Sequence, residues 1–411
     1  MNFGLIGKTL SHSYSAEIHK SIGDYDYELL EIPENELSAF FKKRDFRGIN
    51  VTIPYKEAVM PFLDEISDTA KKIGAVNTVI NSNGRLIGYN TDFYGMLSLI
   101  KHAGIDISGK KVLILGTGGT SKTAFAVAEH LGAREIIFVS RTKKANAVTF
   151  GEAYALHNDA QIILNTTPLG MFPNSDGTPI NIDAFNSLEG VTDAVYNPLR
   201  TNLVLDAKEK GIKAEGGLYM LSAQAVYASS LFTGVAADGK LIESAYASVK
   251  KQKENIVLTG MPSSGKTTVG KILSKALKRE FFDSDTEIEN KTGISIPEFF
   301  KKYGEAKFRE EEKAVIAGLS EKSGCVIATG GGAVLDTKNV RALKRNGKVI
   351  FLNRPLALLT PTSNRPLSSE RASLEKLFGE RYSIYKSAAD IELIADRRLE
   401  DACEEILKEL I

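Results

Sequence analysis

The segment GMPSSGKT, residues 260–267, fits the phosphate-binding pattern G-x-x-x-x-G-K-[ST] at every fixed position. Backbone amides of such a loop surround phosphates, its lysine reaches the β- and γ-phosphates, and its last hydroxyl binds Mg²⁺. A strand-like run, ENIVLTG, precedes the loop and a helix-like run follows it, as the motif requires. The sequence therefore predicts a nucleoside triphosphate site whose contacts are Gly260, Ser263, Ser264, Gly265, Lys266, Thr267 and Thr268.

A second glycine turn, LGTGGTSK at 115–122, lies in the first half of the chain. Its glycines would let backbone amides approach a pyrophosphate at a helix N-terminus. The next strand-like run ends in SRTKK, where a NAD-binding protein usually has an acidic residue for the ribose hydroxyl. Arg141, with Lys143 or Lys144 nearby, instead suits a 2′-phosphate, so the sequence favours NADP over NAD. The predicted pyrophosphate contacts are Gly116, Gly118 and Gly119.

Short hydrogen-bonding side chains gather around this turn, as expected for a site that holds a small polyhydroxylated molecule. Each of them is also a common turn residue, so only the combination carries information. The set comprises Ser13, Ser15, Asn50, Thr52, Lys56, Asn77, Asn90 and Asp92.

Carboxylates and arginines follow the phosphate loop in the second half. Asp283 and Asp285 stand two apart in a strand-like segment, so both carboxylates face one side. One can serve Mg²⁺, and the other can hold a substrate hydroxyl. Arg309, Arg365 and Arg381 are dispersed along the chain and would suit anionic ligands, a substrate carboxylate and phosphates.

The elements that must position these residues belong to α/β layers, because strand-like runs alternate with amphipathic stretches throughout. KKVLILGTGG, SKTAFAVAEHLG and REIIFVSRT form one strand–helix–strand unit, which predicts the doubly wound class. The same order restarts at NIVLTGMPSSGKTTVG. A helix-like stretch with a basic end separates the two, so we place a domain boundary near Lys250–Glu254.

Length and composition narrow the function classes. A chain of 411 residues is too long for one ordinary core, and 43% hydrophobic with 25% charged residues is typical of a soluble globular protein. A net charge of +1 does not indicate nucleic-acid binding, and no apolar run is long enough to span a membrane. Cys325 and Cys403 suggest neither a disulfide framework nor a metal site. The N-terminal MNFGLIG shows no secretory signal, so we expect a cytoplasmic protein.

In combination, the motifs of residues 1–252 resemble shikimate dehydrogenase. They are HSYS, NVTIPYK, GAVNT, YNTD, GTGGTSK, SRT, NTTPLGM, YNP and GGLYMLSAQA, in the family's order. The resemblance implies a two-lobed α/β fold, with a substrate lobe of about residues 1–93 and 220–250 and a Rossmann NADP-binding lobe of about 94–219. It also implies reversible, NADPH-dependent reduction of 3-dehydroshikimate to shikimate.

Site residues follow from the same resemblance, position by position. Lys56 and Asp92 match the catalytic pair, in which Lys56 would donate a proton to the carbonyl oxygen and Asp92 would orient it. The implied substrate contacts are Ser13, Ser15, Thr52, Asn77, Tyr196 and Gln224. The implied contacts to the adenosine end of NADP are Ser140, Arg141, Thr142 and Lys144.

Residues 253–411 resemble shikimate kinase, a P-loop α/β/α domain of the nucleoside monophosphate kinase type. The resemblance implies phosphorylation of the shikimate 3-hydroxyl by ATP with Mg²⁺. Asp285 would orient or deprotonate that hydroxyl, Thr267 and Asp283 would serve Mg²⁺, and Arg365 matches the lid arginine that closes on the phosphates. The implied shikimate contacts are Asp285, Arg309, Gly331, Gly332 and Arg381.

The sequence departs from both families in places. Ser140 and Ala145 replace a usual Asn and Arg, and the span from Arg141 to Asn165 is short, which predicts a trimmed helix or strand. The kinase lid ahead of Arg365 is also short, and 360–361 lacks the usual arginine. The segment 397–398, Arg-Arg, is a further candidate for contact with adenine.

The sequence thus predicts a bifunctional enzyme of aromatic amino-acid and chorismate biosynthesis. A metabolite-binding regulatory protein is the alternative from another class, and it would have lost side chains such as Lys56 and Lys266 that are present here. Quinate remains an alternative substrate, which the Ser13 and Ser15 pair disfavours only mildly. The sequence decides neither between monomer and homodimer nor whether shikimate passes directly between the sites.

Overall fold

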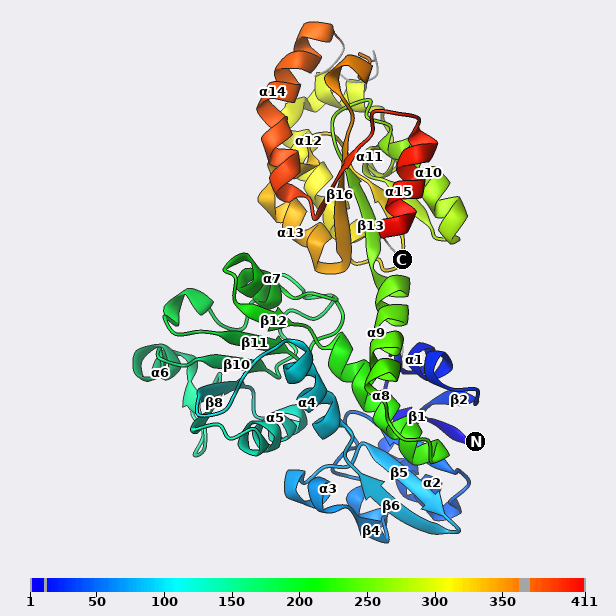
Figure 1. Cartoon of the computed structure of the whole chain (residues 1–411), viewed down its shortest axis with the longest axis vertical. Helices are drawn as coiled ribbons and strands as arrows, with labels where there is room; N and C mark the ends of the chain where they lie inside the picture. The colour runs from blue at the N-terminus through cyan, green and yellow to red at the C-terminus, as the bar shows by residue number, and fades with distance from the viewer. Residues whose placement is uncertain (1, 11–12, 362–369, 410–411) are drawn as a thin grey trace. The chain divides into compact units, whose positions relative to one another are not determined.

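The computed structural model describes residues 2–10, 13–361 and 370–409 (Figure 1). The chain divides into two compact units, Met1–Lys250 and Lys251–Ile411. Each unit is built on parallel or largely parallel sheets with helices on the faces, so the predicted α/β class is confirmed. Within the described ranges, the chain has no helix of the length and apolarity needed to cross a membrane.

The first sheet of unit 1 has the strand order β2-β1-β3-β5-β6-β4. β1 (Phe3–Gly7), β2 (Tyr27–Glu31) and β3 (Gly48–Val51) are parallel, whereas β5 (Thr78–Ser82) runs antiparallel to β3 and to β6 (Arg85–Tyr89). The short β4 (Glu65–Ile66) completes the edge beside β6. Helix α2 (Leu37–Lys43) packs on one face through a buried cluster that includes Phe41, Ile49 and Val79. α1 (Ser15–Ile22) and α3 (Asp68–Ile73) follow β1 and β4 along the chain.

The second sheet of unit 1 is entirely parallel, in the order β12-β11-β10-β7-β8-β9. β7 (Lys111–Leu115), β10 (Ile162–Asn165) and β11 (Gly190–Asp193) form its buried centre, and β12 (Lys213–Glu215) its edge. Alternate residues of β7 face opposite cores, as a strand covered on both sides requires. Val112 and Ile114 pack with α4 (Asp92–His102), α5 (Gly119–His130) and α8 (Leu218–Thr233). Leu113 and Leu115 pack with α6 (Phe150–Leu156) and α7 (Asn202–Glu209).

A hook of seven residues, 141–147, joins β8 (Glu135–Ser140) to β9 (Val148–Thr149). Parallel neighbours normally need a crossover of about a dozen residues or more, usually a helix. Here the hook suffices, because β9 pairs only with the last two residues of β8, Val139 and Ser140. The predicted trimming of this span therefore removes the helix and keeps the strand.

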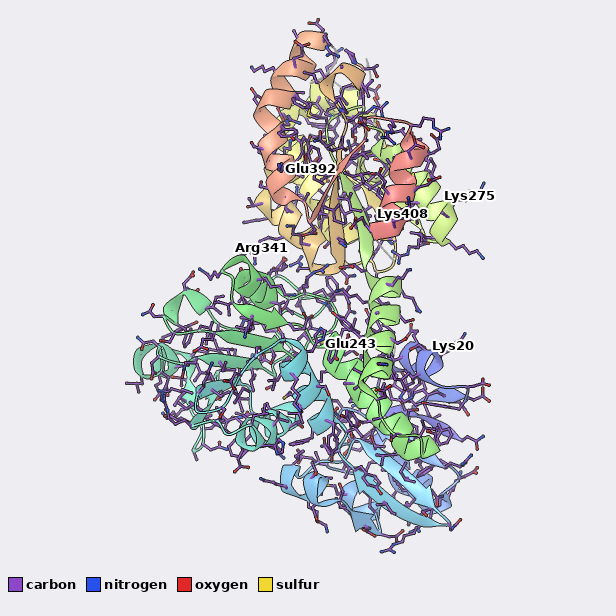
Figure 2. The ribbon with its side chains drawn as sticks, viewed as in Figure 1. Lys20, Glu243, Lys275, Arg341, Glu392 and Lys408 are labelled. Atoms are coloured by element: carbon purple, nitrogen blue, oxygen red, sulfur yellow. The ribbon has the colours of Figure 1, made fainter. Side chains whose placement is uncertain are left out.

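Helix α9 (Gly239–Lys253) is fastened to unit 1 by aromatic and acidic side chains. Glu243, labelled in Figure 2, accepts a hydrogen bond from the Tyr219 hydroxyl at 2.7 Å. His102 stacks on Tyr219, with ring centroids 3.8 Å apart, and its Nδ1 lies 3.2 Å from Glu243. These contacts hold α8 and α9 against α4.

Unit 2 contains a single parallel sheet with the strand order β14-β15-β13-β16-β17. Its strands are β13 (Asn255–Thr259), β14 (Phe281–Asp283), β15 (Val326–Ala328), β16 (Gly347–Asn353) and β17 (Ile391–Ile394). α10 (Lys266–Leu277) and α15 (Leu399–Glu409) cover one face, as the buried cluster of Val269, Leu273 and Ile406 shows (Figure 1). The other helices are α11 (Ser284–Thr292), α12 (Ile296–Ser320), α13 (Thr337–Asn346) and α14 (Arg371–Ala388). α12 is kinked at Gly304, whose φ of 78° is left-handed.

Candidate active sites

Lys56 and Asp92 form an ion pair in unit 1, with Nζ 2.6 Å from Oδ2. Lys56 lies in the turn after β3, and Asp92 is the first residue of α4. A carboxylate in the first turn of a helix is stabilised by the positive end of the helix dipole. Both side chains are mostly buried, with 22% and 14% of their surface exposed, so the pair is partly shielded from water but still reachable.

A buried hydrogen-bond network stands beside this pair. Asn77 Nδ2 donates to the Thr91 hydroxyl at 3.0 Å and lies 3.5 Å from Gln224 Oε1. Thr91 in turn lies 3.4 Å from Gln224 Oε1 and precedes Asp92 in the chain. The residue before β5, the start of α4 and helix α8 thus bring Asn77, Thr91 and Gln224 together from positions far apart in sequence. Sequence reasoning missed Thr91, although it stands inside the YNTD motif.

Of the remaining predicted substrate contacts, Ser13, Ser15 and Thr52 follow the C-terminal ends of β1 and β3, and Tyr196 follows β11. Ser13 donates from its hydroxyl to the Ser15 hydroxyl at 3.1 Å, just ahead of α1. Thr52 directly follows β3, and its amide bonds the carbonyl of Ile6 in β1. Tyr196 packs edge-on against Tyr14 at 5.2 Å, so the loop after β11 reaches the serine segment. Burial, with the charge of Glu17, raises the pKa of Tyr196 and keeps its hydroxyl protonated.

The glycine turn of unit 1 fits a dinucleotide. Gly116 has a φ of 109°, and a Cβ there would contact Thr166. Gly118 caps α5, and a Cβ on Gly118 or Gly119 would meet nothing within 4 Å. There is therefore open space where a pyrophosphate would approach the backbone amides at the start of α5.

Basic side chains of the hook lie beside this turn. Lys144 Nζ donates to the Thr117 hydroxyl at 2.6 Å, which ties the hook to the glycine turn. Lys143 is instead paired with Glu152, and Arg141 is exposed to solvent. Ser140 donates its hydroxyl to the carbonyl of Thr142, so these two residues shape the hook. The positive charges of Arg141 and Lys144 suit a 2′-phosphate group.

A buried carboxylate, Asp193, holds the loops that follow β10 and β11. It accepts hydrogen bonds from Asn165 at 2.9 Å, from the Val195 amide at 3.0 Å and from the Thr201 hydroxyl at 2.7 Å. Burial raises the pKa of Asp193 to about 6, and the three donors only partly oppose this effect. Asp193 therefore fixes the segments NTTP and VYNP relative to each other.

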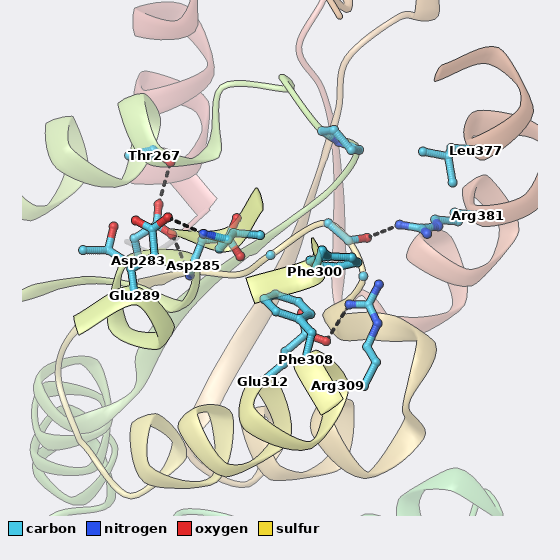
Figure 3. Close-up of a pocket in the computed structure, with 16 residues that line it drawn as sticks. Thr267, Asp283, Asp285, Glu289, Phe300, Phe308, Arg309, Glu312, Leu377 and Arg381 are labelled. Atoms are coloured by element: carbon cyan, nitrogen blue, oxygen red, sulfur yellow. Dashed lines mark hydrogen bonds and ion pairs between the residues drawn. The ribbon is translucent and has the colours of Figure 1, made fainter. Parts of the chain in front are cut away.

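Unit 2 contains a pocket of about 330 Å³ at the C-terminal ends of its strands (Figure 3). Asp283 and Asp285 lie on one side of it, and Arg309 and Arg381 lie across from them. Phe300 and Phe308 add an apolar wall, as expected for a carbocyclic ring. The pocket is further lined by Pro262, Thr267, Thr286, Glu289, Ile296, Glu312, Gly330, Gly331, Gly332 and Leu377.

The phosphate loop has the backbone that its motif predicts. Gly260, Ser263 and Gly265 all have positive φ, and Gly265 caps α10. Lys266 is buried and donates to the carbonyls of Gly260 and Met261 at 2.9 and 2.8 Å. Ser264 is fully buried at the turn, and Thr268 follows in the first turn of α10.

Oxygen donors suited to Mg²⁺ meet at the end of β14. Thr267 donates its hydroxyl to Asp283 Oδ2 at 2.6 Å, and Asp283 Oδ1 caps α11 through the Asp285 amide at 3.1 Å. Among the described residues, no group of three or more His, Cys, Asp or Glu could hold a metal by itself. Mg²⁺ usually takes one or two carboxylates together with substrate phosphates. Thr267 and Asp283 fit that role.

The glycine run after β15 packs against the substrate side chains. A Cβ on Gly330 would collide with the Asp285 carboxylate, and one on Gly332 would collide with the Arg309 guanidinium. Arg381 is buried and donates to the Gly331 carbonyl at 3.2 Å. The predicted contacts Asp285, Arg309, Gly331, Gly332 and Arg381 therefore converge on one pocket.

Glu312 is a pocket residue that sequence reasoning missed. Its side chain is 2% exposed and accepts from Arg309 Nη1 at 2.7 Å, while Oε1 has no partner among the described residues. Burial raises the pKa of Glu312, a direction that the nearby Asp285 reinforces and Arg309 opposes. The three-residue spacing from Arg309 was a usable signal, but the run FREEE looks like an exposed helix face.

The remaining predicted nucleotide contacts are Arg365, Arg397 and Arg398. Arg365 lies outside the described residues. Arg398 is paired with Asp401 at 2.9 Å, whereas Arg397 is exposed. Leu399 lies against Gly265, since a Cβ on that glycine would contact it, so this segment borders the phosphate loop.

Fold and sites define two classes of protein in one chain, a dinucleotide-dependent oxidoreductase unit and a P-loop phosphotransferase unit. Comparison with known proteins agrees. Residues 5–79 match the family model described as shikimate dehydrogenase substrate binding domain, and residues 262–411 match that of shikimate kinase. The shikimate dehydrogenase (NADP(+)) of Clostridium perfringens is 38% identical over 266 residues, which is 60% of this chain and 98% of that protein.

Solved structures cover the same region. A chorismate mutase/shikimate 5-dehydrogenase fusion protein from Clostridium acetobutylicum aligns with a TM-score of 0.58 at 32% identity, over 61% of this chain and 97% of that one. Shikimate 5-dehydrogenase from Thermus thermophilus, in complex with NADP(H) and shikimate, aligns with a TM-score of 0.54 at 33% identity. The alignment covers 60% of this chain and 98% of that one. The chain belongs to the shikimate dehydrogenase family, and a shikimate kinase domain follows the dehydrogenase part. The predicted resemblance to both families is confirmed.

Proposed function

We propose that this chain is a bifunctional enzyme that catalyses two consecutive reactions. Residues 1–252 reduce 3-dehydroshikimate to shikimate with NADPH, and residues 253–411 phosphorylate shikimate at its 3-hydroxyl with ATP and Mg²⁺. The observation that carries the proposal is common to both units: a nucleotide loop stands in the same unit as polar side chains suited to one small acidic, hydroxylated molecule. A cytoplasmic location belongs to the proposal, and the free, buried Cys325 and Cys403 support it.

In the dehydrogenase unit, Lys56 is the proton donor. Bound NADPH supplies a hydride to the carbonyl carbon, so negative charge develops on the carbonyl oxygen. The ammonium of Lys56 stabilises that charge and passes a proton to the oxygen. Asp92, 2.6 Å away, fixes the direction of the ammonium. Asn77 and Gln224, held by Thr91, bind ring hydroxyls, and the Ser13 and Ser15 hydroxyls bind the carboxylate.

In the kinase unit, Asp285 accepts the proton of the attacking hydroxyl or holds that hydroxyl in line. Bound ATP with Mg²⁺ supplies the phosphoryl group. Arg309 and Arg381 bind the substrate carboxylate across the pocket from Asp285 (Figure 3). Lys266, which donates to the carbonyls of Gly260 and Met261, would bind phosphate oxygens, and Thr267 with Asp283 would hold Mg²⁺. Arg365 is the proposed lid residue.

A coupled assay tests both activities. The full chain receives 3-dehydroshikimate, NADPH, ATP and Mg²⁺, and product is identified by mass spectrometry as shikimate 3-phosphate. Lys56→Ala should lower NADPH oxidation by about 10²- to 10⁴-fold, the usual contribution of a positioned acid, while shikimate phosphorylation stays intact. Intact NADPH oxidation in this variant would contradict the role of Lys56. A higher kcat/KM for quinate than for shikimate in the reverse reaction would contradict the substrate.

A further inference from the structure

Unit 1 contains a cavity of about 420 Å³ away from the proposed substrate site. Phe3 and Arg47 line it, at the N-terminal ends of β1 and β3. Ser13 and Thr52, two of the proposed substrate contacts, follow the opposite, C-terminal ends of these strands. The cavity therefore lies at the opposite end of β3 from Lys56 and takes no part in the reaction proposed above.

Three aromatic rings form one wall of the cavity. Phe3 stacks on Phe232 with centroids 4.9 Å apart, and Tyr25 meets Phe3 edge-on at 5.3 Å. Phe232 lies near the C-terminal end of α8, so strand, turn and helix each supply one ring. A wall of this kind binds a flat apolar or aromatic group, since offset and edge-on ring contacts are favourable.

Charged groups stand at the same cavity. The Arg47 guanidinium lies 5.3 Å from the Phe3 ring centroid, and the Arg47 side chain is exposed. Among the described residues, no carboxylate forms an ion pair with Arg47, and Asp24, which also lines the cavity, has no cationic partner either. A guanidinium beside an aromatic wall suits a carboxylate attached to a ring, because it can bind both oxygens and cover the ring face.

The tyrosine of the wall connects to the substrate site through buried groups. The Tyr25 hydroxyl lies 2.6 Å from His19 Nδ1, and His19 stacks on Tyr27 with centroids 3.8 Å apart. The Tyr27 hydroxyl donates to Asn50 at 2.7 Å, and Asn50 donates to Thr78 at 3.0 Å. Thr78 donates to Asn77, one of the proposed substrate contacts, at 3.1 Å. α8 forms a second link, because it carries both Gln224 and Phe232.

From this arrangement, we propose that the cavity bordered by Phe3, Tyr25, Arg47 and Phe232 is an effector site for a small aromatic carboxylate, coupled to the dehydrogenase substrate site. The ring lies on the aromatic wall, and the carboxylate pairs with Arg47. Displacement of Tyr25 by the ligand alters the hydrogen bonds that orient Asn77, so the affinity for substrate changes.

Calorimetric titration of the full chain with 3-phenylpropanoate and, separately, with L-phenylalanine tests the site. The two probes share ring and carboxylate and differ in the ammonium that Asp24 would attract. Both titrations are run with saturating shikimate, which blocks the two substrate sites. We expect saturable binding by at least one probe, weakened tenfold or more by Arg47→Met. Ser230→Leu, which fills the cavity from α8, should abolish it.

Arg134→Met is the matched control, since Arg134 is an exposed arginine that does not line the cavity. It should bind the probe like the wild type. Absence of saturable binding, or equal affinity in wild type, Arg47→Met and Ser230→Leu, would each overturn the site. The KM for shikimate should shift at least twofold with the probe in the wild type and not in Arg47→Met; an unchanged KM would overturn the coupling.

Discussion

A single buried carboxylate orients the arginine that would bind the substrate of the kinase unit. Arg309 has two acidic partners, the buried Glu312 at 2.7 Å and the exposed Glu305 at 2.9 Å. We expect Glu312→Gln to raise the KM for shikimate about tenfold, because a hydrogen bond between charged groups contributes about 1.5–3 kcal/mol. Glu305→Gln removes a solvent-exposed pair, worth at most about 1 kcal/mol, and should change KM little. Phosphorylation kinetics with varied shikimate measures both; equal effects would contradict the assignment.

Asp193 makes the stability of unit 1 depend on pH. Its folded pKa of about 6 lies above the ordinary Asp value of 3.8, so between these values the folded state binds more protons than the unfolded state. Stability should therefore fall as pH rises from about 4 to about 6, by about 3 kcal/mol, and stay level above that. Asp193→Asn keeps an acceptor for Asn165 and Val195 and offers an NH₂ to Thr201, without titrating.

Calorimetric unfolding of the full chain at several pH values measures this difference, with the transition of unit 1 assigned by its shift on addition of NADP. The unfolding free energy of Asp193→Asn minus that of the wild type should be larger at pH 7 than at pH 4. Parallel stability curves for the two proteins would show that folding does not raise the pKa of Asp193.

At the scale of elements, we expect the hook of residues 141–147 to favour NADPH over NADH. Lys144 is held over the glycine turn by Thr117, whereas Glu152 neutralises Lys143. Lys144→Ala should raise the KM for NADPH roughly tenfold and leave the KM for NADH nearly unchanged, because only NADPH carries the phosphate that the ammonium would bind. Lys143→Ala is the control, with a smaller expected effect. Similar losses with both cofactors would mean that Lys144 acts on the shared pyrophosphate or on the fold.

The hook also shows where sequence reasoning succeeds and where it stops. Strand, glycine turn and helix could be predicted for both nucleotide loops, because buried apolar runs and glycines act locally. The short span after Arg141 predicted a missing element, but which one depends on the pairing of β9 with the end of β8, a contact formed only in the fold. Thr91 was missed for the same reason, since its partner Gln224 comes from another element. Glu312 was missed because its burial in the pocket arises only in the fold, although its spacing from Arg309 is local.

At the scale of the whole molecule, each unit has its own buried cores and its own site, so each activity should survive loss of the other. Lys56→Ala should keep the kinase, and Lys266→Ala should keep the dehydrogenase. An equimolar mixture of the two variants should then convert 3-dehydroshikimate to shikimate 3-phosphate, after a lag while free shikimate rises toward the KM of the kinase. The lag should shorten when shikimate is added at the start. If the mixture made no shikimate 3-phosphate while each variant kept its single activity, shikimate would not be leaving the chain that makes it, and transfer within one molecule would be required.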